Sequence, residues 1–224
     1  MVDITQPQQS VRELAAKVSA LEAETRYLRR ALQATADGQL KHQPVWKDLK
    51  VGLTSSGVHP TQSPTLETVV SGEQRQDLAF IVGNQAYCDP FHIDHDIVPG
   101  SLMYPHVHWE SDHVTTSSSL TWRLYFTRAK GHQQEAFSTE SYIDITHNFS
   151  STGHMHMVTE CSDAQALRAF EPDELIKVTL ELQSVTGFTP HKTSAGLRIF
   201  GLMVDIHYLA GTVGTINKSP NFYV

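Results

Sequence analysis

Two histidines, His106 and His108, stand one residue apart in the stretch LMYPHVHWESD, which spans residues 102–112. On a β-strand, side chains two residues apart lie on the same face, about 6.5–7 Å from each other. Both imidazoles can therefore bind one divalent ion, as histidines do in zinc and iron sites. Residues of the other parity, Val107 and Trp109 among them, are apolar and should face the core. We expect His106 and His108 on the outward face, as the candidate metal ligands.

Two interpretations of this pair involve no catalysis. In the first, the histidines are ordinary polar side chains and the protein carries no cofactor. In the second, an oligomer whose strands run along a threefold axis gathers three copies of the pair around one axial ion. His154 and His156 have the same spacing and could serve in that role instead. The stretch FHIDHDIVPG (91–100) also contains ligand-type residues, but it is typical of a polar loop that ends in a Pro-Gly turn.

An enzymatic alternative is a cupin-type metal-dependent enzyme that uses His106, His108 and His207. The order Gly100, His106, His108, Asp112 approaches the first cupin motif, although a cupin has glutamate where Asp112 stands. No Pro-x-Gly turn precedes His207, as the second cupin motif would require. The sequence also has no Gly-x-Ser-x-Gly elbow, no phosphate-binding glycine loop and no cysteine beside a base. We therefore favour a protein that is not an enzyme.

The composition is that of a globular protein, with 40% hydrophobic and 18% charged residues. A net charge of −7 at pH 7 argues against nucleic-acid binding, because neutralising phosphates requires clustered lysine and arginine. No basic-then-apolar leader is visible and no apolar run approaches about 18 residues, so we expect no membrane insertion. Cys88 and Cys161 are isolated, and they neither imply nor exclude a disulfide.

A coiled-coil helix is expected at residues 10–37, between an N-terminal tail (1–9) and a linker (38–44). Ser10 and Glu13 form a capping-box signature at its start. The apolar residues that follow repeat at alternating spacings of three and four, which is the heptad pattern of a coiled coil. The predicted oligomer interface consists of Val11, Leu14, Val18, Leu21, Thr25, Leu28 and Leu32.

This narrow apolar seam predicts self-association, because a helix that packs on its own domain usually has a wider apolar face. The flanking charges agree, since Lys17 can meet Glu22 of a neighbouring helix and Glu24 can meet Arg29. Valine at a with leucine at d favours two strands, whereas KVSALE at 17–22 resembles the basic-a-x-x-d-acidic pattern of trimeric coiled coils. We expect a homotrimer; a single amphipathic helix lying on its own domain is the alternative.

From residue 45 onwards the hydrophobic period changes to two, which predicts half-buried β-strands. About eight strands without long helices between them predict a mainly β fold, an antiparallel jelly-roll-like β-sandwich at residues 45–224. A short helix is expected at Ala164–Phe170. The expected strands are Trp46–Leu53, Leu78–Val82, Met103–Trp109, Trp122–Thr127, Ser141–Ile145, His154–Thr159, Ile176–Gln183 and Leu197–Leu209.

Four stretches, in this order along the chain, carry a family resemblance: VWKDLKVGL (45–53), MYPHVHWE (103–110), LTWRLYFTRAKG (120–131) and GLMVDIHYLAGTVGT (201–215). Together they resemble a family of structural proteins of tailed double-stranded-DNA bacteriophages. Its members have a Trp-x-Asp-Leu strand, a His-Pro-His-Val-His-Trp-like strand, a Trp-containing strand and a C-terminal strand that ends in Asp-x-His-Tyr. In this chain Tyr104 stands in place of the family's first histidine.

The resemblance implies a non-enzymatic component of a phage virion, assembled in the bacterial host cytoplasm: a neck or tail fibre, a collar or a capsid decoration protein. Its expected partners are further copies of itself and other virion proteins. Trp46, Trp109 and tyrosines could in addition line a groove for a host surface glycan. The coiled coil would tether the β-domain and fix its copy number, so that several weak contacts act together at high effective concentration.

Overall fold

The computed structural model describes residues 17–18, 21–22, 24–30 and 44–211, except for 99, 132, 168–169, 173 and 195; of residues 54–58 it describes the backbone alone. The expected tail and nearly all of the expected linker lie outside the described residues, as do Val11, Leu14 and Leu32 of the predicted interface. Residues 212–224 of the expected β-domain also lie outside them.

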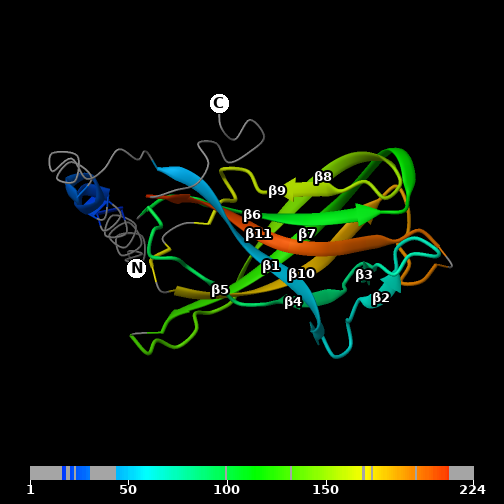
Figure 1. Cartoon of the computed structure of the whole chain (residues 1–224), viewed down its shortest axis with the longest axis horizontal. Coiled ribbons are helices and arrows are strands. Elements are labelled where there is room, and N and C mark those ends of the chain that lie inside the picture. Colours follow the sequence, from blue (N-terminus) through cyan, green and yellow to red (C-terminus); the bar gives the residue numbers. More distant parts are fainter. Residues whose placement is uncertain are drawn as a thin grey trace, which may run out of the picture.

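Strands dominate the described part of the chain, and they pair antiparallel throughout (Figure 1). Eleven strands are present there: β1 (Val45–Val58), β2 (Thr65–Thr68), β3 (Gln76–Phe80), β4 (Gln85–Cys88), β5 (Phe91–His92), β6 (Met103–Ser111), β7 (Val114–Lys130), β8 (Ser141–Thr152), β9 (Met157–Glu160), β10 (Glu174–Thr186) and β11 (Ile199–Ala210).

The first sheet is built around β11. On one side β11 pairs with β1 from Val45 to Gly52 and, further along, with β3, beyond which lies β2. On its other side β11 pairs with β6, and β6 pairs in turn with β9. This sheet therefore brings the start of the described β-domain next to its end, with the histidine-containing strand β6 on the far side.

The second sheet contains β4, β5, β7, β8 and β10. Here β10 lies between β4 and β7, β7 pairs with β8, and β5 pairs with the start of β10. Strand β1 joins the two sheets, because beyond Gly52 its residues Leu53 and Val58 pair with β4 instead of β11. In Figure 1, β1 runs obliquely across the molecule from β11 towards β4.

Four of the strand pairs are nested along the chain: β1 with β11, β4 with β10, β6 with β9, and β7 with β8. Each pair joins segments from the two halves of the domain, apart from the last, which is a hairpin of neighbours. The expectation of a mainly β, antiparallel, sandwich-like fold is confirmed.

The core lies between the two sheets and follows the predicted alternation. Along β10, every second residue from Ile176 to Leu182 is apolar and at most 2% exposed. Phe80 of the first sheet and Trp122 of the second meet edge to face, with ring centroids 5.3 Å apart. Burial of such a side chain stabilises the fold by about 1.5–3 kcal/mol relative to exposure, so contacts of this kind between the sheets stabilise the sandwich.

Several local expectations differ from the structure. Strands β2, β4 and β5 were not expected, and β5 lies in a stretch that was expected to be a loop. Strand β1 continues past its expected end at Leu53 to Val58, because β4 supplies a new partner. The short helix expected at Ala164–Phe170 is wrong: residues 163–165 form a turn, and Leu167 forms an isolated bridge with Met103.

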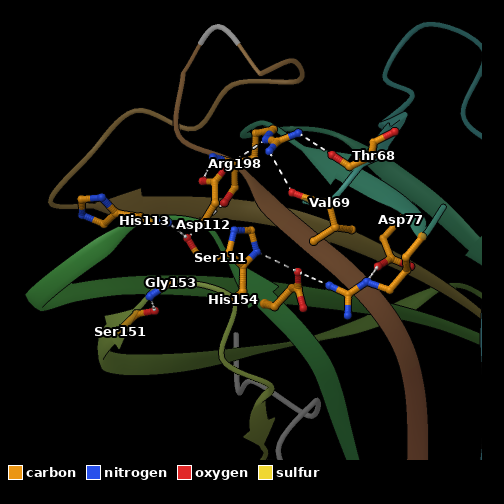
Figure 2. Close-up of polar contacts among 12 residues, drawn as sticks. Thr68, Val69, Asp77, Ser111, Asp112, His113, Ser151, Gly153, His154 and Arg198 are labelled. Carbon is orange, nitrogen blue, oxygen red and sulfur yellow. Dashed lines mark hydrogen bonds and ion pairs between the residues drawn. The ribbon is translucent and has the colours of Figure 1, made fainter. Parts of the chain in front are cut away.

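A buried arginine fastens the start of β11 to the segment after β2 (Figure 2). Arg198 is 8% exposed and forms an ion pair with Asp112, with Nε 2.7 Å from Oδ2. Its guanidinium also donates hydrogen bonds to the carbonyl oxygens of Thr68 and Val69, at 2.8 and 3.1 Å. Because Asp112 follows β6 directly, this arginine connects three segments at one end of the first sheet.

The described residues of the expected coiled coil, 17–18, 21–22 and 24–30, are helical. The apolar side chains of Val18, Leu21 and Leu28 are 46%, 60% and 51% exposed. Thr25, also on the expected seam, donates its hydroxyl to the carbonyl oxygen of Leu21 at 2.7 Å. Nowhere in the described part of the chain does a helix have the length and apolar character needed to cross a membrane.

Candidate metal centre

Four strands of the first sheet place histidines and carboxylates next to one another on its outer face. In the registers of these strands, Asp48 of β1 lies opposite His207 of β11, and Asp205 of β11 lies opposite His106 of β6. Glu160 of β9 in turn lies opposite His106. Cross-strand neighbours share a face of the sheet, so residues more than 100 positions apart in the sequence form one cluster.

The parity expected for β6 holds in the structure. Met103, Val107 and Trp109 are fully buried members of the hydrophobic core, which leaves His106 and His108 on the opposite face. The outer face is nevertheless well covered at this point, because His106 is only 2% exposed and Asp205 3%. Charged or polar groups at this depth need partners, and the cluster supplies them.

Asp205 lies between the two histidines of β6. His106 Nε2 contacts one carboxylate oxygen, Oδ1, and His108 Nε2 lies 3.2 Å from the other, Oδ2. The two imidazole rings are 5.0 Å apart between centroids. Asp205 Oδ1 is buried, and among the described residues it receives no hydrogen bond of good geometry. One carboxylate therefore faces two ring nitrogens, with one oxygen for each.

The second nitrogen of each histidine also faces a definite neighbour. His106 Nδ1 lies 3.4 Å from the backbone carbonyl oxygen of Tyr104. His108 Nδ1 lies 2.7 Å from Nε2 of His156, and these two rings stack with centroids 4.9 Å apart. These contacts at Nδ1 orient the rings of His106 and His108, so that both Nε2 atoms point at Asp205.

His207 has a different environment, although its ring centroid is only 4.2 Å from that of His106. Its Nε2 lies 2.8 Å from Asp48 Oδ1, and its Nδ1 lies 3.3 Å from Glu160 Oε1. Both nitrogens therefore face carboxylate oxygens, which is the arrangement of a doubly hydrogen-bonded imidazolium.

The pKa values in the cluster follow these contacts. Burial raises the pKa of Asp205, but the contacts with His106 and His108 lower it further, to about 2. Burial lowers the pKa of His207, but Asp48 and Glu160 outweigh it and raise that pKa to about 9. The pKa of Asp48 is correspondingly lowered, chiefly by its hydrogen bond with His207. The carboxylates of Asp48 and Asp205 therefore remain charged across the physiological range, and His207 is protonated there.

Two groups of side chains in the described residues could each hold a metal ion, and both include His106. One group is His106, His108 and Asp205; the other is His106, Glu160 and His207. Within each group the ligand atoms all lie within 4.8 Å of one another. Each offers two imidazole nitrogens and one carboxylate, a donor set that suits zinc, iron and related divalent ions.

The sequence-predicted ligands are therefore brought together in part. His106, His108 and His207 of the cupin alternative do lie side by side, but Asp112 of the same motif pairs with Arg198 instead. His154 and His156 do not converge on one point. His156 contacts His108, whereas His154 faces Glu110, with Nδ1 3.4 Å from Oε1.

In the loop FHIDHDIVPG, a candidate ligand makes other polar contacts. Asp96 pairs with Lys47, and the hydroxyl of Tyr208 donates to Asp96 Oδ1 at 3.0 Å. Among the described residues, no group of three converging ligands lies in this loop. Trp109, a candidate glycan-binding residue, is fully buried, so it cannot line a surface groove. Trp46 is half-buried and meets the edge of Tyr104 at 5.5 Å between ring centroids.

No protein-family model matches the sequence, and no curated protein sequence matches it. Among solved structures, one that is similar contains the CBM22-1 and GH10 modules of endo-1,4-β-D-xylanase 10B from Clostridium thermocellum, complexed with xylohexaose. It has 13% identity and a TM-score of 0.34; the match covers 76% of this chain and 30% of that chain.

A second similar structure is Eiger TNF from S. frugiperda. The identity is again 13% and the TM-score is 0.30, with 80% of this chain and 98% of that chain covered. Both scores are too low to carry an argument about fold or function.

Proposed function

We propose that this chain is a non-enzymatic structural component of a tailed-phage virion, a fibre, collar or capsid decoration protein that acts as a homotrimer. The N-terminal helix is the oligomerisation element and the β-domain is the part that contacts other virion proteins. The observation that carries the proposal is the exposed apolar seam of the helix, at Val18, Leu21 and Leu28. A single chain leaves this seam in water, which costs free energy that self-association recovers.

The seam fits a second copy of the same helix better than another partner. Lys17 and Glu24 flank it on one side and Glu22 and Arg29 on the other, so like helices in parallel would place opposite charges together. The heptad spacing gives each apolar residue an equivalent partner in the neighbouring copy. We favour three copies because of the KVSALE pattern at 17–22.

The strand order of the β-domain supports a jelly roll, the architecture common in viral capsid proteins. In a jelly roll, two Greek keys pair the first strand with the last, the second with the last but one, and so inwards. The nested pairs β1–β11, β4–β10, β6–β9 and β7–β8 follow that order. The four stretches that resemble the phage family include parts of β1, β6, β7 and β11, so the resemblance covers both sheets.

Substitution of one seam residue tests the assembly. Leu21→Asp places a charge in each copy of the seam, and we expect the mass by light scattering to fall from three chains to one. The β-rich circular dichroism should remain, because the β-domain keeps its own core. Arg30→Asp, on the helix face opposite the seam, introduces the same side chain and should leave the trimer intact. A wild-type protein that is already a single chain at micromolar concentration would contradict the proposal.

A second candidate function is binding of a host surface glycan, and the outer face of the second sheet favours it. Tyr125 of β7 lies opposite Tyr142 of β8, and both Tyr125 and Tyr87 of β4 lie opposite Thr179 of β10. Tyr87 is 39% and Tyr142 57% exposed, and the guanidinium of Arg123 lies 4.2 Å from the Tyr142 ring centroid. Rows of exposed aromatic rings with polar neighbours suit the flat faces of sugars.

Host polysaccharide binding can be measured with the trimeric wild type against Tyr142→Ala and Tyr142→Phe. Loss in the first variant and retention in the second would support stacking on the ring. Equal binding by all three proteins would remove this candidate without affecting the assembly proposal.

A further inference from the structure

We propose that one divalent transition-metal ion binds within a single chain, between β6 and β11, held by the Nε2 atoms of His106 and His108 and by the carboxylate of Asp205. This inference does not depend on the virion role. It goes beyond the proposed assembly, because it assigns a ligand to a face that assembly leaves unexplained.

The first support is burial around ligand atoms that already converge. The side chains of His106, His108 and Asp205 are 3%, 17% and 4% exposed, and their ligand atoms lie within 4.8 Å of one another. The three residues stand on two directly paired strands, with Asp205 opposite His106. Little movement is therefore needed for the three groups to surround one ion.

The second support is the hydrogen-bonding capacity of the groups. A carbonyl oxygen only accepts, so the contact with the Tyr104 carbonyl orients Nδ1 of His106 as a donor and directs Nε2 towards Asp205. Nε2 faces Asp205 Oδ1, and a divalent cation can take the place of a proton between these two atoms. Asp205 Oδ1 is one of four buried side-chain atoms that lack a hydrogen bond of good geometry among the described residues. A cation bound by Nε2 and Oδ1 gives this buried oxygen a partner.

The third support is that Nδ1 of each histidine, the ring nitrogen that would not bind the ion, already has a neighbour, as is usual for ligating histidines. His108 Nδ1 lies 2.7 Å from His156 Nε2, so it can donate there and leave Nε2 free for the ion. His106 donates to a backbone carbonyl in the same way. These outer contacts are compatible with the tautomers that metal binding requires, in which Nδ1 donates outward and Nε2 faces the ion.

The alternative group, His106 with Glu160 and His207, is less suited to an ion. Both nitrogens of His207 already face carboxylates, Asp48 at 2.8 Å and Glu160 at 3.3 Å. Ligation by His207 would require it to give up one of these contacts. We therefore assign His207 to an ion-pair network beside the metal site and not to the metal itself.

The donor set defines the class of ion. Two imidazoles and one carboxylate suit Zn²⁺, Co²⁺ or Ni²⁺, whereas Mg²⁺ and Ca²⁺ prefer oxygen ligands throughout. Three protein ligands leave one position for water in a tetrahedral site. Because all three come from one chain, the expected ratio is one ion per chain, in contrast to a single axial ion shared by three chains.

The test uses the full-length protein, stripped with a chelator and then titrated with Zn²⁺ by calorimetry, with Co²⁺ absorption as a readout of coordination geometry. We expect one ion per chain for the wild type and no binding of Mg²⁺. Asp205→Asn and His108→Gln should each weaken Zn²⁺ binding by at least about a hundredfold, with unchanged far-ultraviolet circular dichroism as the check of folding. His154→Gln, a nearby histidine outside the site, should bind as the wild type does.

Two further variants separate this proposal from its rivals. His207→Gln should bind Zn²⁺ with nearly the wild-type affinity, and a loss as large as that of Asp205→Asn would overturn the ligand assignment. Leu21→Asp should retain one ion per chain even as a monomer, and a ratio of one per three chains that disappears in this variant would overturn the single-chain site. A wild-type ratio near zero would also overturn it. Zn²⁺ binding with wild-type affinity by a well-folded Asp205→Asn protein would also overturn the proposed site.

Discussion

Trp109 and Thr159 lie on the paired strands β6 and β9, and the indole Nε1 of Trp109 donates a hydrogen bond to the hydroxyl of Thr159 at 2.8 Å. Trp109 is fully buried and Thr159 is 2% exposed. His147 Nδ1 lies 3.0 Å from the same hydroxyl, and its ring meets the edge of Trp109 at 5.7 Å between centroids. The largest side chain of this part of the core thus has its one polar atom satisfied by a residue 50 positions away.

Thr159→Val should therefore destabilise the protein although it conserves shape. The indole N–H would be left buried without an acceptor, which costs about 1–3 kcal/mol. Urea unfolding followed by Trp fluorescence measures the difference. Thr159→Ser keeps the hydroxyl and should lose less than the valine variant, mainly through the missing methyl group. If the valine variant proved as stable as the wild type, the hydrogen bond would make no net contribution to the free energy of unfolding.

The ion pair of Asp112 with Arg198 should stabilise the fold much more than the ion pair of Asp144 with Arg123. Both have N–O distances of 2.7 Å, but the Asp112 side chain is 14% exposed and that of Asp144 is 38% exposed. Asp112→Asn leaves a buried guanidinium without its counter-charge, at a cost of about 3 kcal/mol. Asp144→Asn, partly in water, should cost less than about 1 kcal/mol. Equal losses in urea unfolding would contradict the distinction by burial.

The fold could be predicted where strands are long and their alternation is strong. The alternating residues of β10 from Ile176 to Leu182 are an example, since burial of every second residue is a local signal. β4 was missed because four residues, Gln85–Cys88, are too short to show a period. The continuation of β1 to Val58 was missed because serines and a glycine are typical of turns, and only the pairing with β4 makes them a strand.

The candidate metal centre could be predicted only on one of its strands. The parity of His106 and His108 is local, and it is confirmed by the burial of Val107 and Trp109. Asp205 joins them through the register of β6 with β11, a relationship across almost 100 residues that no periodicity reveals. A signal was nevertheless present in β11, where Asp205 and His207 alternate with large apolar residues just as the histidines of β6 do.

Cys88 should be nearly inert while the protein is folded. Burial, with a smaller contribution from the charge of Asp89, raises the pKa of its thiol from 9.0 to about 12. Three pKa units lower the thiolate fraction at pH 8 about a thousandfold, and the thiolate is the form that alkylates. Iodoacetamide labelling at pH 8, read by peptide mass spectrometry, should therefore modify Cys88 readily in urea and hardly at all in the native protein. Rapid labelling of the native chain would show that β4 opens far more often than its packing suggests.

Binding of Zn²⁺ should raise the stability of the fold, because the proposed ligands come from paired strands that separate on unfolding. An ion that binds only the folded state stabilises it by about 2.7 kcal/mol when its free concentration is a hundred times the dissociation constant. We expect the urea midpoint of the wild type to rise by the corresponding amount in Zn²⁺ and to remain unchanged in Mg²⁺. Asp205→Asn should show no Zn²⁺ effect, whereas His154→Gln should respond fully. A Zn²⁺ effect of equal size in both variants would place the ion elsewhere on the chain.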